Sequence, residues 1–576
     1  MIPRFWLPLL LLVLGLQTVT AQDAENEQTT TNQGRLSGNL QLNGNFFMRD
    51  SSIGAANTPQ YDRQLFGAES WLNLNYQNWG FDMGIRFDMF NNSNLLNPNG
   101  SYTDIGVGRW YVSRKINKLG ITAGYIYDII GSGIIFRAYE ERPLAIDQAL
   151  YGIRTTYDLT DNWTVKAFTG RQKQQFDTYA SVLRGAAIDG FVGSDSSKVT
   201  LAPGFGVVAR TLDDGSMNNL VADLNTYRKV DILQMFPDTL NGEGPNYNTY
   251  AFSFYNTLTA GPFAWYLETA MKTKEVIADP FGERVTVSGD TISGKRYINK
   301  SGSVIYTSLS YAKQGLGITV EGKRTENFDF RTRPQEEGVR GLIHYIPPMT
   351  RVNTYRLLAR YAAATQFIGE QAFQVDASYA VNKKLSLSAN FSNITNLDGD
   401  QLYREVFTEI YYKYKRKWTL TTGVQFQDYN LEVYFGKPEA APAKTVTPYV
   451  DFLYKFNPKT SIRLESQYMS MSKSHGVRSD YGNWVFGLAE FTLAPHWAIT
   501  VSDMYNINPG KESPIDVETG EKEKIHFPRF DVYYTHKANR FSLSYVKQVQ
   551  GVVCSGGICR LEPAFSGVKM SVNSTF

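Results

Sequence analysis

The sequence predicts an all-β fold, a transmembrane antiparallel β-barrel of about 22 strands. Apolar and polar residues alternate along most of the 576-residue chain, and the last residue, Phe576, is aromatic. Aromatic residues make up 14% of the sequence, and membrane barrels use them in girdles at both interfaces. Beyond the signal-like N-terminus, no apolar run approaches the roughly 20 residues that a membrane helix needs.

The end of the chain shows the alternation most clearly. Val568, Met570, Val572 and Phe576 share one parity, and polar side chains occupy most of the other. Because successive side chains of a strand point to opposite faces, this segment has one apolar and one polar face. An amphipathic last strand that ends in an aromatic residue resembles the closing strand of bacterial outer-membrane barrels. We therefore expect the apolar parity to face lipid and Phe576 to act as an assembly signal.

Residues 1–21 are predicted to be a secretory signal peptide. One basic residue precedes an apolar run from Phe5 to Leu16, and Ala21 fits a cleavage site. A membrane anchor is the alternative, but the run is too short to span a bilayer. Residues 22–34 are polar and lack an apolar period, so they are predicted to form a disordered periplasmic tail. The barrel is then expected to occupy residues 35–576.

Charge and hydropathy narrow the class of protein. Lys and Arg number 58 against 55 Asp and Glu, which gives a formal net charge of +3 and argues against a nucleic-acid partner. The mean hydropathy of −0.31 is that of a water-soluble chain, but a barrel evades this test because only alternate residues face lipid. The alternative, a soluble β-sandwich or propeller array, predicts repeats of about 40–50 residues, and the sequence shows none.

The expected strands follow one another as hairpins. The clearest pair spans residues 66–77 and 81–89 around the tight turn Asn78-Trp79-Gly80. Similar short turns recur at residues 117–118, 161–162, 261–262, 382–384, 415–417, 457–459, 495–496 and 538–539. Longer polar segments lie at residues 173–246, 279–300, 327–351 and 506–525. Short turns on one side and long loops on the other are typical of outer-membrane barrels, with the turns periplasmic and the loops extracellular.

One opening strand, about ten hairpins and one closing strand give about 22 strands, and the pattern allows an even number from about 18 to 22. Residues 355–372 and 430–435 fit a strand or a loop equally well. A barrel of this width has a lumen that must hold water or a plug.

One stretch, residues 124–147, breaks the alternation. Pairs of isoleucines place apolar groups on both faces, and charged residues cluster there. These candidate lumen or constriction residues are Asp128, Arg137, Glu140, Glu141, Arg142 and Asp147. An ionised side chain that faces lipid near the midplane of a barrel costs about 2–4 kcal/mol. We therefore expect residues 128–147 to fold into the lumen, with Arg137 and Arg142 paired to acids and other ions paired to Arg114, Arg154 or Lys166 of the wall.

The two cysteines, Cys554 and Cys559, flank a Ser-Gly-Gly-Ile sequence. In an exported protein, such a close pair is most simply a small disulfide loop. A metal site would need further thiol or imidazole ligands nearby, and a thioredoxin-like motif would have two intervening residues rather than four. The sequence favours the disulfide.

Two segments resemble a known family. They are Gly-Ser-Gly-Ile-Ile-Phe-Arg-Ala-Tyr-Glu, residues 131–140, and Gly-Val-Val-Cys-Ser-Gly-Gly-Ile-Cys-Arg, residues 551–560. Both are similar to segments of a Bacteroidota outer-membrane β-barrel family of unknown function, as is the signal peptide that ends in Ala-Gln. The resemblance implies a barrel in the outer membrane of such a cell. It implies no activity and no catalytic residue.

Catalytic and metal chemistry find little support. The five histidines are His344, His475, His496, His526 and His536. A Ser-His or Asp-His site needs a base held by a partner, and no acid stands close to His475 in the sequence, so an exposed loop is favoured. The runs 213–215 and 396–400 could supply oxygen ligands to Ca²⁺, but ordinary turns explain them better. The sequence predicts no enzyme, no catalytic residue, no metal site and no cofactor.

Arginines are dense between residues 324 and 360, and two interpretations stay open. The stretch contains Arg324, Arg331, Arg333, Arg340, Arg351, Arg356 and Arg360. If several of these face the lumen, they would favour anions. If they lie on an exposed loop, they would meet the anionic lipid A surface.

The predicted function is that of a porin-like channel in the bacterial outer membrane, with the segment 128–147 narrowing the pore. The alternative is a non-transporting structural or assembly component of an envelope complex, or a surface-binding barrel. The expected partners are outer-membrane lipid, lipid A, the barrel-assembly machinery during insertion and, for the alternative, other envelope proteins. No nucleic-acid partner is expected.

Overall fold

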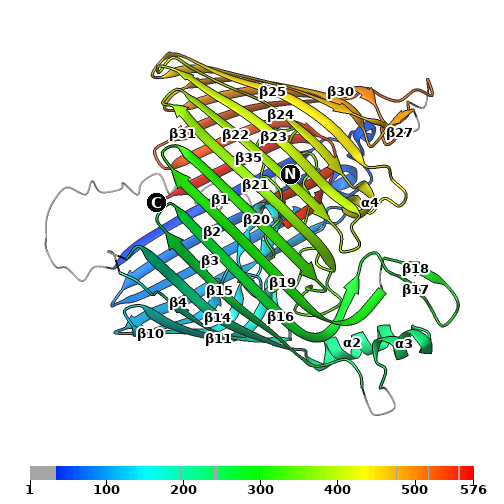
Figure 1. The fold of residues 1–576 in the computed structure, drawn as a ribbon. Helices are drawn as coiled ribbons and strands as arrows, with labels where there is room; N and C mark the ends of the chain where they lie inside the picture. Colours follow the sequence, from blue (N-terminus) through cyan, green and yellow to red (C-terminus); the bar gives the residue numbers. More distant parts are fainter. Residues whose placement is uncertain are drawn as a thin grey trace, which may run out of the picture.

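The computed structural model describes residues 34–194, 197–238, 243–294, 296–474, 476–516, 518–555 and 558–576, without the side chains of residues 552–561. Over these residues the chain forms a closed antiparallel barrel of 24 strands (Figure 1). The predicted all-β barrel fold is confirmed. The predicted signal peptide, residues 1–21, and all but the last residue of the predicted tail lie outside the described residues.

The barrel strands are numbered with gaps because short strands lie between them. The first half of the wall comprises β1 (Arg35–Phe47), β2 (Phe66–Asn78), β3 (Phe81–Ser93), β4 (Tyr102–Ile116), β5 (Leu119–Ile126), β10 (Leu150–Thr160), β11 (Trp163–Gln174), β13 (Val182–Gly190), β14 (Val199–Thr211), β15 (Asn248–Ala260), β16 (Phe263–Asp279) and β19 (Arg296–Lys313). The second half comprises β20 (Leu316–Glu326), β21 (Gly369–Asn382), β22 (Leu385–Thr395), β23 (Gln401–Tyr414), β24 (Trp418–Tyr429), β25 (Ala443–Asn457), β26 (Thr460–Met471), β29 (Gly482–Leu493), β30 (Trp497–Pro509), β31 (His526–His536), β32 (Asn539–Gln548) and β35 (Phe565–Thr575).

The first and last strands close the barrel. Strand β1 pairs with both β2 and β35, and the seam with β35 runs from Asn39 opposite Thr575 to Phe47 opposite Gly567. Phe576 extends the seam, because its N–H donates to the Gly38 carbonyl at 2.9 Å and its carbonyl accepts from the Gly38 N–H at 2.8 Å. Met570 is 42% exposed on the outer face.

The strand number exceeds the predicted range because the long loop expected at residues 173–246 contains a further hairpin. Strands β13 and β14 pair within it in antiparallel register. The outward row of β14 is apolar, but over residues 202–208 its inward row is small or apolar rather than polar, as at Gly206 and Val208. The alternation of apolar and polar residues that identifies a strand with one polar face is therefore missing from this part of β14. A further short turn, Gln314-Gly315, joins β19 to β20.

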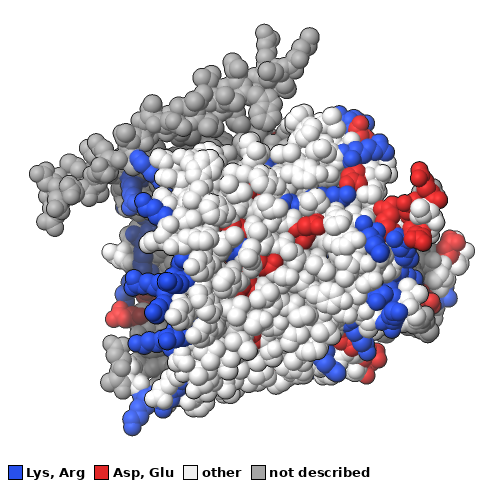
Figure 2. Space-filling model, turned by 90° about the horizontal axis from the view of Figure 1, so that it is seen from above, with Lys and Arg blue, Asp and Glu red and all other residues white. Residues whose placement is uncertain are grey.

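The wall has the two faces that a membrane barrel requires. On β3, Ile85 and Phe87 are exposed on the outside, whereas Arg86 and Asp88 are 2% and 4% exposed on the inside. On the face in view, Figure 2 shows a mostly uncharged band, with charged side chains gathered at its two ends. Lysine and arginine dominate the end that carries the short turns, for example at Lys118, Lys384 and Lys417. The uncharged band is what contact with hydrocarbon demands.

Several short helices and strands lie within the long connections between the barrel strands. They are the helices α2 (Asp214–Leu224), α3 (Lys229–Met235) and α4 (Leu431–Phe435), the 3₁₀ turns at Ser51–Ile53 and Arg142–Leu144, the π turn at Gln60–Gln64, and the strands β6 (Asp128–Ile130), β7 (Phe136–Ala138), β8 (Glu140–Glu141), β9 (Ile146–Asp147), β12 (Asp177–Thr178), β17 (Glu283–Val285), β18 (Thr291–Ser293), β27 (Lys473–Ser474), β28 (Val477–Arg478), β33 (Gly551–Ser555) and β34 (Ile558–Glu562). The ambiguous residues 430–435 are thus mainly helix α4. None of the described helices has the length and apolar character to cross a bilayer.

Two connections fold against the inner face of the wall. The first inward segment, residues 127–149, joins β5 to β10, and the second inward segment, residues 327–368, joins β20 to β21. Apolar side chains of both segments are almost completely buried and belong to one large core cluster with wall residues. Ile134 and Ile135 of the first segment and Phe328 and Phe330 of the second are each 0% exposed. Much of the lumen is therefore packed like a protein core.

Candidate functional site

The first inward segment is held by Arg86, an arginine on the inner face of β3. Its guanidinium donates to Asp88 at 2.6 and 2.8 Å, to Asp147 at 2.9 Å and to Glu140. Lys173 of β11 binds Asp147 from another side at 2.5 Å. A charge buried without a partner costs several kcal/mol, and here each buried cation meets at least one carboxylate. The acids of the segment are thus tied to two separate strands of the wall.

Two of the three expected wall partners contact the segment. Asp128 accepts from Arg154 at 3.3 Å and from Lys166 at 3.1 Å. The third, Arg114, instead places its guanidinium 4.6 Å from the centre of the Phe81 ring. Arg142 lies 3.3 Å from Glu140 and donates to Gln41 of β1 at 3.1 Å.

Arg137 differs from its expected role, because it contacts aromatic rings rather than a carboxylate. Its guanidinium lies between the rings of Tyr139 and Tyr345, at 3.8 and 4.0 Å from their centres. A cation between two ring faces is attracted to the negative face of each ring. Since Tyr345 belongs to the second inward segment, Arg137 joins the two segments.

Backbone hydrogen bonds strengthen this junction. The Arg137 N–H donates to the Ile343 carbonyl at 2.8 Å, and the Tyr345 N–H donates to the Gly133 carbonyl at 2.9 Å. We call this set of contacts the latch. Its glycine adopts a left-handed backbone conformation, with φ of 104° at Gly133, which a side chain would disfavour. The two inward segments are therefore one connected body in the lumen.

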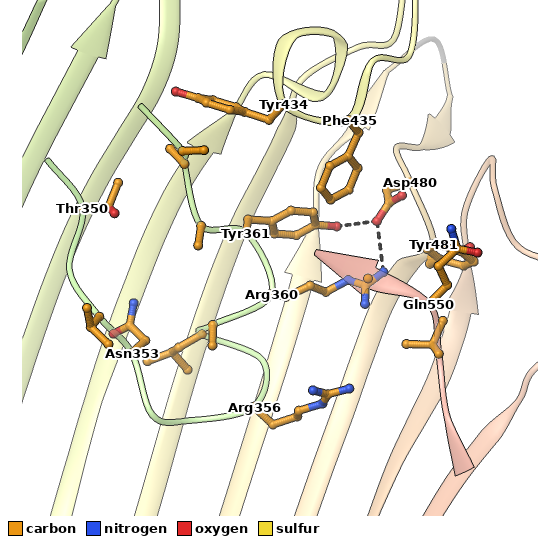
Figure 3. A pocket seen from close by; sticks show the side chains of 18 of the residues that line it. Thr350, Asn353, Arg356, Arg360, Tyr361, Tyr434, Phe435, Asp480, Tyr481 and Gln550 are labelled. Atoms are coloured by element: carbon orange, nitrogen blue, oxygen red, sulfur yellow. Dashed lines mark hydrogen bonds and ion pairs between the residues drawn. The ribbon is translucent and has the colours of Figure 1, made fainter. Parts of the chain in front are cut away.

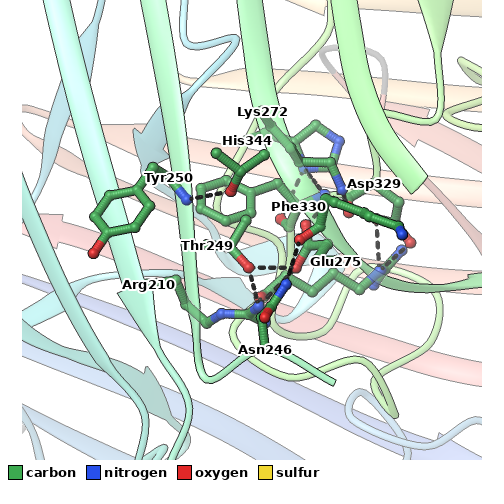
Figure 4. Close-up of polar contacts among 12 residues, drawn as sticks. Arg210, Asn246, Thr249, Tyr250, Lys272, Glu275, Asp329, Phe330 and His344 are labelled. Carbon is green, nitrogen blue, oxygen red and sulfur yellow. Dashed lines mark hydrogen bonds and ion pairs between the residues drawn. The ribbon is translucent and has the colours of Figure 1, made fainter. Parts of the chain in front are cut away.

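A polar network anchors the second inward segment to the wall (Figure 4). Arg210 of β14 binds Glu275 of β16 at 2.7 Å, and Lys272 binds the same carboxylate at 2.5 Å. Lys272 also donates to the backbone carbonyl of Asp329 at 2.9 Å. In this way one buried carboxylate joins two cations of the wall to the start of the segment.

His344 is buried at the centre of the same network. Its Nδ1 lies 3.2 Å from the Phe330 N–H, which donates to it, and 2.9 Å from the Phe330 carbonyl. Burial, reinforced by the nearby charges of Arg331 and Lys272, lowers the pKa of His344 to about 4, and Asp329 opposes this effect. The imidazole is therefore neutral at physiological pH. The buried position of His344 could not be predicted from the sequence, because a single histidine forms no sequence pattern that indicates burial.

A second buried pair fixes the end of the same segment. Lys323 of β20 and Glu370 of β21 lie 2.6 Å apart, and both side chains are 0% exposed. The ammonium also donates to the Pro347 carbonyl at 2.7 Å and to the Thr365 hydroxyl at 3.0 Å. Removing one partner of such a pair is far more costly than the pair is stabilising, because it leaves a buried charge alone.

Beside this packed region lies a cavity of about 740 Å³. Residues 348–364 line one side of it, and its opposite side comprises residues of α4, of the connection before β29 and of residues 548–551. Asp480 accepts from Tyr361 at 2.7 Å and from Arg360 at 3.2 Å (Figure 3). Lys437 also binds Asp480, at 3.3 Å. The cavity is large enough for a small organic solute.

A second cavity of about 430 Å³ adjoins the first. The two share Arg356, Met504 and Gln548 in their linings. The second cavity is lined mainly by the inner faces of β29 to β32, including Arg529 and Arg540. Arg356 therefore stands where the two spaces meet.

Six of the seven arginines in the dense stretch lie in the second inward segment, and the seventh lies on a strand of the wall. Arg331, Arg351, Arg356 and Arg360 belong to the second inward segment, and Arg331 binds Asp329 at 2.8 Å. Arg324 instead lies on the outer face of β20, half exposed, and binds Glu326 at 2.8 Å.

The candidate calcium runs form turns and caps. The Asp213 carboxylate accepts from the Ser216 N–H and caps helix α2. The side chain of Asn396 accepts from the Asp400 N–H at 2.7 Å and closes a turn. No group of three or more potential metal ligands is present among the described residues.

The cysteine prediction concerns side chains outside the described part of the chain. Strands β33 and β34 pair in antiparallel register, with Cys554 directly opposite Cys559. Opposed residues of such a pair have Cα atoms about 4.5–5.5 Å apart, a separation that a disulfide can bridge. The disulfide stays a prediction. His475 also lies outside the described residues.

This chain is similar at low sequence identity to several solved β-barrels, and it matches one family model over most of its length. The siderophore receptor PirA from Pseudomonas aeruginosa is 10% identical, with 95% of this chain and 81% of that chain covered and a TM-score of 0.39. The translocation pore of the P pilus usher PapC is 11% identical, with 94% and 99% covered and a TM-score of 0.41. OccAB3 from Acinetobacter baumannii is 10% identical, with 69% and 93% covered and a TM-score of 0.31. No curated protein matches the sequence. A model described as a family of unknown function, DUF6029, matches residues 4–576, and the chain belongs to that family.

Proposed function

We propose that this protein is a porin-like, non-enzymatic channel in the outer membrane of a Bacteroidota cell, and that small solutes pass through its lumen. The outer-membrane setting is supported by the uncharged outer band and by short turns at one end of the barrel with long connections at the other. The resemblance of residues 131–140 and 551–560 to a Bacteroidota family supports the source. Lipid A and the barrel-assembly machinery are the partners that such a location supplies.

The observation that carries the proposal is the pair of adjoining cavities beside the second inward segment. Their volumes, about 740 and 430 Å³, are in the range of small-molecule sites. Charged and polar side chains line them, among them Arg356, Asp480 and Arg529. A purely structural barrel gains nothing from unfilled polar space in its interior. We assign the space to passing solute, with residues 128–147 narrowing the pore.

The test is conductance of the purified barrel in planar lipid bilayers. Ala498 lines the second cavity from β30, whereas its neighbour Ile499 is exposed on the outer face. Ala498→Trp should lower the unitary conductance several-fold because the ring fills the cavity. Ile499→Trp, which adds the same ring on the outside, should leave the conductance unchanged.

A second candidate is a non-transporting barrel, either structural, involved in assembly, or surface-binding. The buried pairs Lys323–Glu370 and Arg210–Glu275 favour it, because they fix the second inward segment firmly in the lumen. If neither the wild-type protein nor a variant lacking residues 128–147 conducts ions, the channel proposal is wrong. A stable envelope partner that co-purifies would then support the second candidate.

A further inference from the structure

Among the described residues, Arg356 has no hydrogen-bond, ion-pair or ring partner, although it lines both cavities. Other cations of the two linings are compensated by carboxylates, except Arg540, which lies 4.7 Å from the centre of the Tyr533 ring. Arg360 binds Asp480 at 3.2 Å, and Arg529 binds Asp531 at 2.8 Å. In Figure 3 the Arg356 side chain extends into the open part of the cavity, away from the Arg360–Asp480 contact.

The surroundings of Arg356 make that position electropositive. Enclosure of this exposed side chain within the barrel, together with the positive charges of Arg360 and Arg529, lowers the pKa of Arg356 to about 10, and Glu562 opposes this effect. The carboxylate of Glu562 accepts from Gln548 at 3.4 Å. An anion beside Arg356 would relieve the repulsion between the cations. A guanidinium offers two parallel N–H donors, the geometry that a carboxylate or phosphate accepts.

The apolar part of the first cavity's lining fits the uncharged part of such a molecule. Tyr434, Phe435 and Tyr481 line it, together with Leu358 and several alanines. Aromatic walls with few convergent polar groups are typical of sites for organic ligands. A bare inorganic ion would leave this apolar surface uncovered.

We propose that the two cavities form a binding site for a small organic anion, with the anionic group on Arg356 and the apolar body against the aromatic wall. This inference rests on the proposed channel function and names its substrate class. A carboxylate and a phosphate can both accept the two N–H donors of the guanidinium. The probes benzoate and phenyl phosphate distinguish these two anionic groups. Arg356 is then the residue that selects for charge in the lumen.

The experiment measures equilibrium binding to the folded, detergent-solubilised barrel by isothermal titration calorimetry. The probes are benzoate, phenyl phosphate and the neutral benzyl alcohol. Saturable binding of at least one anion is expected, with no binding of the alcohol. Arg356→Gln should weaken that binding about tenfold or more, since a bidentate charged contact is lost. Arg324→Gln, which removes an arginine from the outer face, should leave it unchanged.

Channel recordings separate this inference from the proposed function. In a potassium chloride gradient, the reversal potential of the wild type should indicate anion preference, and Arg356→Gln should shift it toward cations. Conduction without anion binding, or binding that Arg356→Gln does not weaken, overturns the inference and leaves the channel intact. Anion binding that depends on Arg356 in a barrel that does not conduct supports the site and overturns the channel.

Discussion

At the scale of single residues, buried ion pairs hold the inward segments against the wall of the lumen. Arg86 meets three carboxylates and is only 2% exposed. Lys323 and Glu370 are both inaccessible to solvent. Buried ions are weak evidence for stability, since their desolvation offsets much of their attraction. Their value here is positional, because they fix where the inward segments lie against the wall.

The buried His344 makes the docking of the second inward segment sensitive to pH. Its pKa falls from 6.5 to about 4 on folding, so protonation favours the undocked state. Docking is fully favoured above pH 6.5 and loses about 3 kcal/mol as the pH falls to 4. Hydrogen exchange of residues 327–368 should therefore accelerate on acidification, after correction for the intrinsic rate.

A matched pair of variants isolates the contribution of the imidazole from that of the other groups in the protein. His344→Gln removes the titrating group and should flatten the pH dependence between 6.5 and 4. His496→Gln, at an exposed turn, should leave it as in the wild type. Equal pH dependence in all three proteins would refute the role of His344.

At the scale of elements, the sequence predicts a strand only where apolar and polar side chains alternate, so that one face of the strand is polar. Strand β3 could be predicted because Ile85 and Phe87 alternate with Arg86 and Asp88. Strand β14 could not, because over residues 202–208 its inner face is small or apolar rather than polar. A Cβ atom on Gly206 would lie 2.4 Å from Ile130 of the first inward segment. The inner face of β14 therefore lacks polar side chains at the place where the first inward segment packs against it.

The candidate site could also be predicted only in part from local sequence patterns. The charges of residues 128–147 stood out in the sequence, since they could not face lipid. Their main partners, Arg86 and Lys173, did not, because long-range pairing leaves no local pattern. Arg137 resembled an ion-pair residue by type, and only the approach of Tyr345 from a segment far along the chain gave it another role.

The latch between the inward segments should control how often the lumen opens. Two cation–π contacts of about 1 kcal/mol each hold Arg137, so their loss should raise the undocked population roughly 30-fold. Arg137→Gln should increase the frequency of large openings in single-channel recordings. Arg137→Lys, which keeps a cation, should restore much of the wild-type behaviour. An Arg137→Gln channel that gates like the wild type would show that the latch has no such role.

At the scale of the whole molecule, closure of the barrel depends on one seam between the two ends of the described chain. A closed barrel has no unpaired strand edge, so every backbone group in the membrane finds a partner. The seam between β1 and β35 ends at the reciprocal hydrogen bonds of Gly38 and Phe576. The aromatic ring lies over Gly38, where an added Cβ would be 2.7 Å from ring atoms and from a backbone carbonyl.

Deleting Phe576 should therefore impair insertion, because it removes both hydrogen bonds and the ring that covers Gly38. The fraction of heat-modifiable, folded barrel on cold gels should fall several-fold. Gly38→Ala should weaken the same seam by pushing the ring away. Gly44→Ala is the matched control on β1, since its Cβ would meet only the end of the Met570 side chain at an ordinary 3.7 Å. Normal yields of folded barrel from both seam variants would show that closure does not depend on this contact. A defect confined to the deletion would instead assign the effect to recognition of the terminal aromatic residue during assembly.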